Sequence, residues 1–380
     1  MSKHLKLFIL LLILYIGLGL PDSLLSTTWP DISKDINVSV GYISVFSIIA
    51  IFCSMISSSM TYKLNSLLGV VNVILLSMFM CFSGIIIFLV FRNFESLILV
   101  QVIMGLGAGA IDSNVNFIAS QNLKVGEMNF LHGFWGVGVT LTPLITTAVY
   151  TLGFNEWAVY AVVAGLFVLL IGYAYMFREL LDVEISDVQS EGAKLRVKGK
   201  DMLGIAIYFL YGVEFLIGTF LASYLVTIIG VSSAKAAFAV SCYWGGLMVS
   251  RLLMPIIFKY VKSSKVLYLH ISILTLCAFL INVDSYNLLI LTFILIGYCF
   301  GPIFPTFVHY TERINGEQAG FYISRQISSM YLSIFLSQVL VGALATKYSL
   351  AFFSSIVMIM ILLLVVFIFI YLNTYKSVID

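Results

Sequence analysis

Apolar runs as long as a bilayer is thick recur from one end of this chain to the other. A helix needs about 20 such residues to cross the hydrocarbon core, and twelve runs of this kind lie between charged or turn-forming residues. The first six lie at 5–28, 40–60, 68–91, 96–120, 128–151 and 156–178. The other six lie at 201–229, 234–258, 264–283, 287–311, 317–346 and 349–373. Because unpaired backbone groups are costly in lipid, such runs fold as helices. The chain is therefore predicted to be an all-α membrane protein with twelve transmembrane helices.

Composition supports this prediction and excludes several other classes. Of the 380 residues, 61% are hydrophobic and 10% are charged, whereas an ordinary soluble domain has roughly half and a quarter. The net charge of +2 gives no sign of a nucleic-acid surface. The cysteines all lie inside apolar runs without the spacing of metal ligands, so we expect buried thiols, no metal and no cofactor. No group of residues typical of catalysis is present, so an enzyme is not expected.

One sizeable polar segment divides the runs into two sets of six. It predicts an N-terminal six-helix bundle at 1–178, a water-exposed linker at 179–200 and a C-terminal six-helix bundle at 201–380. Short cytoplasmic loops are enriched in Lys and Arg, and with the N-terminus inside most cations fall on the cytoplasmic side. We therefore expect a multi-pass protein of the cell membrane with both termini and the linker in the cytoplasm. Two six-span halves are typical of alternating-access transporters, whose solute site lies between the halves near the bilayer midplane.

Three acidic residues interrupt the apolar runs: Asp22 in the first, Asp112 in the fourth and Glu214 in the seventh. An ionisable side chain in the middle of a bilayer is costly unless it is paired, hydrated or neutral. Asp22 follows glycines and Pro21, which favour a broken helix that could line water. Asp112 lies among small residues and shares a helix face with Asn116. These positions predict that both acids point into the bundle.

A carboxylic acid in a partly dry cavity can bind and release a proton during a transport cycle. Asp22, Asp112 and Glu214 are therefore predicted to couple transport to protons. The alternative for each is an acid neutralised by a structural arginine or by hydrogen bonds.

Other polar side chains inside the runs predict further roles. Arg251 and Arg325 lie toward the cytoplasmic ends of the eighth and eleventh runs, where a gate-closing or loop-fixing ion pair is expected. His132, which lies near Asn129 at the start of the fifth run, is a candidate proton relay, with a hydrogen-bonded structural role as the alternative.

Aromatic rings accompany the polar groups in several runs. Tyr15, Trp135, Tyr211 and Trp244 could stack on the apolar face of a sugar, and ordinary helix packing is the alternative. The predicted solute site consists of Asp22, Asp112, Asn116, Asn129, His132, Trp135, Tyr211, Glu214 and Trp244. The tenth run is expected to break at the GPIFP segment, 301–305.

Six segments carry a family resemblance: GLPDS at 19–23, GLGAGAIDSNVN at 105–116, NFLHGFWGVG at 129–138, YGVE at 211–214, YWGGLMVSR at 243–251 and GPIFP at 301–305. Together they resemble the Major Facilitator Superfamily and, within it, the fucose permease-like sugar:proton symporters. The resemblance covers both halves and implies two six-helix bundles that rock around a central cavity, in a monomer. In that family an acid in the first span and one in the fourth serve substrate binding and proton coupling. By position these roles fall on Asp22 and Asp112.

The leading hypothesis is a secondary transporter that moves a monosaccharide or a related polyol together with protons. The alternative is a proton-driven antiporter that exports an amphipathic drug or metabolite, which the aromatic lining and the three buried acids also permit. The expected partners are a small-molecule solute, protons and membrane lipid.

Overall fold

The computed structural model describes residues 2–123, 125–181 and 202–379, and over these ranges it contains helices and no strand. The first half comprises α1 (Lys3–Asp22), α2 (Leu24–Asp35), η1 (Val40–Tyr42), α3 (Ile43–Leu68), α4 (Val70–Phe91), α5 (Phe94–Asn122), α6 (Val125–Thr151), α7 (Glu156–Met176) and η2 (Arg178–Leu181). The second half comprises α8 (Met202–Tyr211), α9 (Val213–Thr227), α10 (Ser233–Ile257), α11 (Ser263–Leu280), α12 (Tyr286–Phe300), α13 (Ile303–Asn315), η4 (Gly316–Gln318), α14 (Ala319–Lys347), α15 (Phe352–Thr374) and α16 (Lys376–Ile379).

Every predicted run is matched by a helix or by two helices in succession, so the predicted all-α membrane fold is confirmed. Among the described residues, 11 helical segments are long and apolar enough to cross a membrane. Helix α6 is the twelfth member of the bundle, and its sequence includes polar residues such as His132 and several threonines.

Three spans are each broken into two helices. The first breaks at Ser23 between α1 and α2, beside Pro21, and the tenth breaks at Gly301 and Pro302 between α12 and α13. Both breaks were expected from the prolines. The seventh span also breaks, at Gly212 between α8 and α9. The eleventh run forms one unbroken helix, α14.

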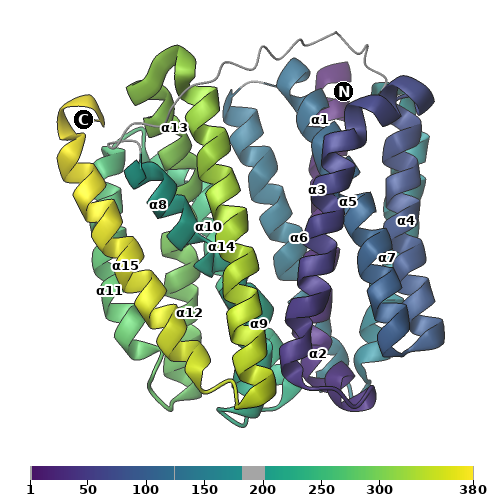
Figure 1. The fold of residues 1–380 in the computed structure, drawn as a ribbon. Coiled ribbons are helices and arrows are strands. Elements are labelled where there is room, and N and C mark those ends of the chain that lie inside the picture. The colour runs from purple at the N-terminus through teal and green to yellow at the C-terminus, as the bar shows by residue number, and fades with distance from the viewer. Residues whose placement is uncertain (1, 124, 182–201, 380) are drawn as a thin grey trace.

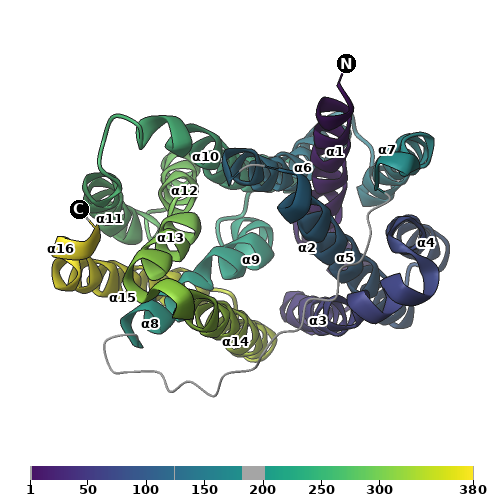
Figure 2. The same ribbon diagram turned by 90° about the horizontal axis from the view of Figure 1, so that it is seen from above.

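The two halves of the chain gather side by side, and both chain ends lie at the same face of the molecule (Figure 1). We call this face the termini face and the opposite one the far face. Figure 2, the view from above, shows α1–α7 on one side and α8–α16 on the other. The halves of the broken spans divide between the faces: α1, α8 and α13 lie toward the termini face, whereas α2, α9 and α12 lie toward the far face. The linker predicted at 179–200 lies outside the described residues from 182 onward, so the domain boundaries stay a prediction.

Contacts between the two halves are concentrated toward the far face. There α2 packs on α9, and η1 and α3 pack on α14. Helix α6 of the first half and helix α10 of the second half also pack extensively on each other. Among the described residues, α1, α8 and α13 make their substantial contacts within their own half. The molecule is therefore joined at the far face and along α6 and α10.

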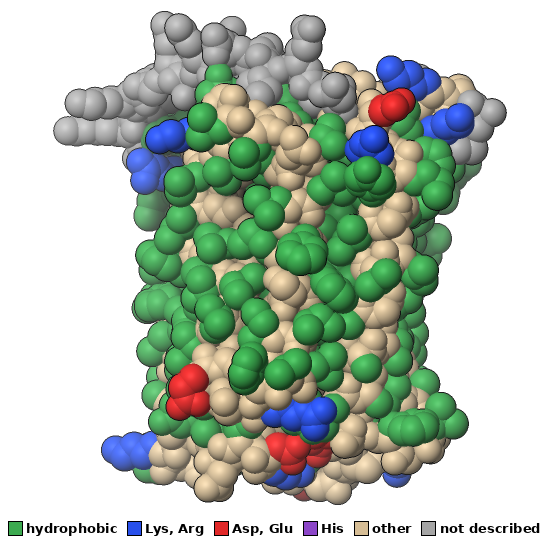
Figure 3. Space-filling view, turned by 90° about the vertical axis from the view of Figure 1, so that its right-hand side faces the viewer, with side chains coloured by type: hydrophobic (Ala, Val, Ile, Leu, Met, Phe, Trp, Pro, Cys, Tyr) green, Lys and Arg blue, Asp and Glu red, His purple; other side chains and the backbone are tan. Residues whose placement is uncertain are grey.

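The outer surface of the molecule matches a bilayer. Figure 3 shows a broad band of hydrophobic side chains between two rims at which Lys, Arg, Asp and Glu gather. Large apolar side chains are exposed in both halves of the chain, among them Phe52, Phe79, Leu169, Leu276 and Phe369. A contiguous apolar belt of this kind is typical of a surface that contacts lipid. The chain is a multi-pass membrane protein.

Candidate functional site

The break in the first span sets the position of Asp22. Pro21 has no backbone N–H, so the helix loses a hydrogen bond there. The next residue, Ser23, has its hydroxyl group donating to the backbone carbonyl of Val139 on α6, at 2.9 Å. The end of α1 is thereby tied to α6, and the Asp22 carboxylate lies beside that helix, midway through the bundle.

Close backbone contact between α1 and α6 fixes this arrangement. A Cβ atom on Gly19 would collide with the backbone carbonyl of Trp135, and one on Gly138 would collide with that of Ile16. At this separation the indole Nε1–H of Trp135 donates to Oδ2 of Asp22 at 2.7 Å. The side chain of Asp22 is nevertheless exposed, at the break between α1 and α2 partway along the bundle (Figure 1).

The second acid, Asp112, is held from two helices. The hydroxyl of Tyr15 on α1 donates to Oδ1 of Asp112 at 3.4 Å and to Oδ1 of Asn116 at 2.9 Å. The Asn116 amide donates to the same Asp112 oxygen at 2.9 Å, as expected for two residues one helical turn apart. Asp112 is exposed like Asp22, and the two carboxylates are close enough to interact electrostatically. The structure thus brings the two predicted N-terminal acids together.

His132 belongs to the same wall. Its ring packs edge-on against Tyr15 with 5.3 Å between ring centroids, and it is exposed. It also lies within electrostatic range of Arg251 from the other half of the chain. The side chain of Asn129, which was predicted to join the site, lies outside the described residues.

The facing wall contains a buried ion pair. Arg251 Nη2 lies 3.5 Å from Oε1 of Glu214 and donates to the Tyr211 hydroxyl, also at 3.5 Å. Glu214 is 1% exposed, and its second carboxylate oxygen has no hydrogen-bond partner among the described residues. A buried charge of this kind is tolerated because its partner is close. Arg251, predicted to be a gating residue, therefore pairs with a predicted site residue.

Aromatic rings bridge the two walls. Trp135 on α6 packs edge-on against Trp244 on α10, with 5.6 Å between ring centroids. Its ring is also tilted against that of Phe215 on α9, with 6.3 Å between centroids. The Arg251 guanidinium carbon lies 5.6 Å from the centroid of the Trp135 ring. The exposed ring of Tyr331 on α14 is within electrostatic range of both Asp22 and Asp112. Side chains from both halves therefore meet around the two N-terminal acids.

Most of the predicted site residues lie in this one region, and Arg325 is placed apart from them. Arg325 is exposed and lies over Phe321 on its own helix, with its guanidinium carbon 5.4 Å from that ring's centroid. Phe215 and Tyr331 were not among the predicted site residues. One is the neighbour of Glu214, and the other follows two serines and a methionine inside an apolar run. A search for aromatic residues close to polar ones would have found both.

The buried pair gives a testable expectation for stability. Changing only one partner, as in Glu214→Gln or Arg251→Gln, leaves an unpaired buried charge and is expected to lower the free energy of unfolding by about 3–5 kcal/mol. The double variant removes both charges and should recover at least half of that loss. Thermal unfolding of the four proteins in detergent measures this. Single variants as stable as the parent protein would contradict a buried, energetically coupled pair.

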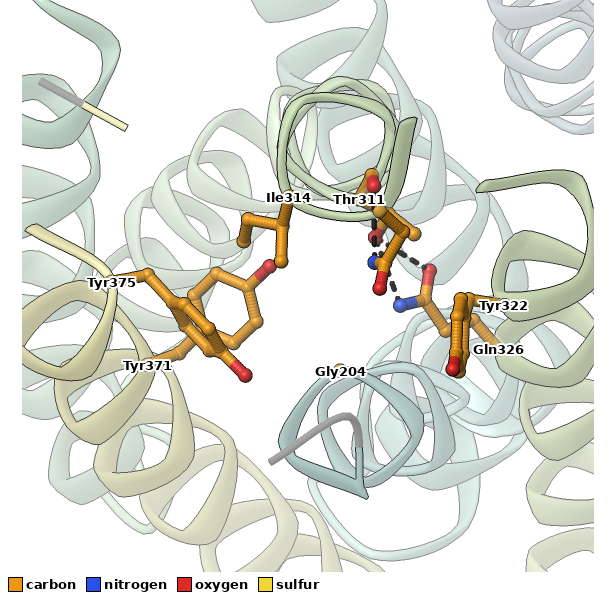
Figure 4. A pocket seen from close by; sticks show the side chains of 8 residues that line it. Gly204, Thr311, Ile314, Tyr322, Gln326, Tyr371 and Tyr375 are labelled. Carbon is orange, nitrogen blue, oxygen red and sulfur yellow. Dashed lines mark hydrogen bonds between the residues drawn. The ribbon is translucent and has the colours of Figure 1, made fainter. Parts of the chain in front are cut away.

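A small cavity lies away from these residues. Figure 4 shows a cavity of about 10 Å³ in the second half of the chain, toward the termini face, lined by Gly204, Thr311, Ile314, Asn315, Tyr322, Gln326, Tyr371 and Tyr375. Thr311 and Gln326 exchange hydrogen bonds of 2.9 and 3.1 Å beside it. This volume suits one water molecule. Among the described residues, no three His, Cys, Asp or Glu side chains gather as a metal site requires.

Comparison with known proteins places the chain in a family. The structure is similar to a crystal structure of a mutant of the nucleoside transporter NupG, with a TM-score of 0.73, 14% identity, and coverage of 99% of this chain and 100% of that one. It is also similar to the crystal structure of a D-xylose–proton symporter, with a TM-score of 0.70, 11% identity, and coverage of 97% and 98%. No curated protein matches the sequence. The model of the Major Facilitator Superfamily matches residues 11–323, so the chain belongs to the Major Facilitator Superfamily of transporters.

Proposed function

We propose that this protein carries a neutral monosaccharide or related polyol across the cell membrane together with protons. The observation that supports this proposal most is the pair of exposed carboxylates, Asp22 and Asp112, inside a bundle of apolar helices. An acid retained at that depth is expected to have a function. Two acids within electrostatic range of each other favour a site in which at least one of them binds and releases a proton.

The hydrogen bonds of these acids leave room for a solute. The described partners of Asp22 and Asp112 engage one oxygen of each carboxylate, Oδ2 of Asp22 and Oδ1 of Asp112. The other oxygen of each can accept a hydrogen bond from a solute hydroxyl. Sugars present many such hydroxyls together with an apolar ring face, and the Trp135 ring, whose indole bonds to Asp22, offers an aromatic face there. Carboxylates beside aromatic rings therefore favour a polyol.

Charge balance at the site also favours an uncharged solute. On the facing wall, Arg251 is already paired with Glu214, so it has no free charge for an anion. On the N-terminal wall the two acids carry protons for part of the cycle under this proposal. The two neighbours named by their titles as a nucleoside transporter and a D-xylose–proton symporter act on solutes that contain sugar rings, which is consistent with the same solute class here.

The uneven contact between the two halves supports transport by alternating access. Packing of α2 on α9 and of η1 on α14 closes the far face, whereas α1, α8 and α13 stay within their own halves. This asymmetry is expected of a carrier whose site opens toward the termini face. Lys and Arg are more frequent in the loops on the same side as the chain ends, which supports a cytoplasmic termini face.

Proton movement in liposomes that contain the purified protein tests the proposal. Monosaccharides and polyols are added one at a time while the internal pH is recorded. One sugar is expected to draw protons inward, and the Asp22→Asn variant should lose that signal. If no sugar moves protons and an imposed pH gradient instead expels an amphipathic compound, the protein is an antiporter and the sugar proposal is wrong.

A further inference from the structure

We propose that Trp135 is a positioning residue that transmits the protonation state of Asp22 from the N-terminal half of the chain to the C-terminal half. This inference rests on the proposed role of Asp22 in exchanging a proton. Trp135 would link the protonation of Asp22 to the packing between the two halves of the chain.

The first step is the hydrogen bond between the indole and the acid. Trp135 Nε1 lies 2.7 Å from Oδ2 of Asp22. A hydrogen bond to an ionised carboxylate is about twice as strong as one to a neutral group. When Asp22 takes up a proton, the bond to the indole becomes weaker. The indole is therefore a direct sensor of the charge on Asp22.

The second step is that the same ring contacts the other half of the chain. Its neighbours there are the Trp244 ring at 5.6 Å, with an interplanar angle of 86°, and the Phe215 ring at 6.3 Å. The Arg251 guanidinium carbon lies 5.6 Å from its centroid. A change in the tilt of the Trp135 ring therefore alters contacts with α9 and α10 together.

The third step is that close packing around Trp135 restricts its response to Asp22 to a movement of the indole side chain. The backbone of Trp135 lies so close to Gly19 that α1 and α6 cannot come any closer to each other. On the opposite side, Trp244 packs on Gly218, where even a Cβ atom would collide with the indole. The Trp244 indole is thereby fixed on α9. Its Nε1–H has no hydrogen-bond partner among the described residues.

Other titratable groups lie around Asp22 and Trp135, and a test must distinguish their titrations from that of Asp22. They are Tyr15 on α1, Asp112 on α5, His132 on α6, Tyr211 on α8, Glu214 on α9, Arg251 on α10 and Tyr331 on α14. The Asp22→Asn variant separates them, because it removes one titration and leaves all of the others.

Fluorine NMR of the full-length protein labelled with 5-fluorotryptophan tests the inference without any solute. The chain has four tryptophans, and replacing each by phenylalanine in turn assigns its resonance. The resonances of Trp135 and Trp244 are both expected to shift with pH in the parent protein. In Asp22→Asn, the part of each pH-dependent shift that comes from Asp22 should be absent, and the total shift should be smaller. In Trp135→Phe, the Trp244 resonance should lose its response although Asp22 is still present.

Two results would overturn the inference: a Trp244 resonance that still follows pH in Trp135→Phe, or a Trp135 resonance that titrates equally in Asp22→Asn. Trp29 serves as an internal reference, since its indole donates to the backbone carbonyl of Val40, far along α2. Its resonance should not differ between the parent protein and Asp22→Asn.

A transport measurement distinguishes failure of this inference from failure of the proposed function. In Trp135→Phe, the ratio of proton-driven accumulation to passive solute exchange should fall about tenfold, because the charge-assisted bond is lost. An unchanged ratio overturns the inference even if the parent protein is a symporter. If the parent protein moves no sugar with protons, the proposed function fails and the fluorine signals alone decide the role of Trp135.

Discussion

Replacing Asp112 by asparagine is expected to abolish proton-driven accumulation of the solute while exchange of solute across the membrane continues. Asparagine keeps the shape of the side chain and can still accept hydrogen bonds from Tyr15 and Asn116. It cannot bind and release a proton at physiological pH. The binding geometry is therefore preserved, and the coupling to the proton gradient is lost.

Two assays on the same liposomes measure this effect. Uphill accumulation under an imposed pH gradient should fall to the level of liposomes without protein, and counterflow of labelled solute should remain. Asp35→Asn is the matched control, because Asp35 ends α2 near the far face and is exposed there, away from the site. Full accumulation by the Asp112→Asn protein would show that Asp112 does not carry the coupled proton.

Adding one methyl group at Gly41 is expected to prevent the far face from closing. A Cβ atom at this position would collide with the backbone carbonyl of Gly342 and the backbone N of Thr346 on α14. Backbone atoms cannot move aside as a flexible side chain can, and overpacking typically costs about 1–3 kcal/mol. A cost of about 1.4 kcal/mol already changes the ratio of two conformations tenfold, so Gly41→Ala should slow transport by about tenfold or more.

Labelling from one side of the membrane distinguishes failed closure from a folding defect. In a protein without its native cysteines, a cysteine introduced by Tyr331→Cys should react faster with an impermeant maleimide added at the far face when Gly41→Ala is also present. Gly320→Ala, near the start of α14, is the matched control, since nothing lies within 4 Å of its added Cβ. Equal labelling rates in all three proteins would show that contact at Gly41 does not seal the far face.

The sequence was sufficient to predict the spans because their cause is local. Each span is a run of apolar residues whose backbone must bond to itself in lipid, and two of the three breaks lie at prolines. The break at Gly212 has no proline, so only a weak local signal marks it. The pairing of Asp112 with Asn116 was also predictable, since one helical turn separates them.

Relations between distant spans were not predictable from one sequence. Glu214 and Arg251 lie on different helices, and whether two such helices turn the charged faces toward each other depends on packing across the whole bundle. The position of Arg251 in its span predicted an ion pair, but its partner was not predictable. Tyr331 lies near the N-terminal acids only because α14 borders the other half of the chain. Sequence distance carries no information about such contacts.

The broken spans mean that opening the far face and rearranging the acids need not be one event. The seal there involves α2 and α9, which are separated by breaks at Ser23 and Gly212 from the rest of their spans. A short helix that meets its neighbour at a break can tilt without unwinding that neighbour. The bonds of Asp22 and Asp112 to their partners can therefore persist while the seal loosens. Under the proposed function, water would then reach the site from the far face before the site itself has changed, so that leak of solute and slippage of protons would be separate properties that different substitutions alter.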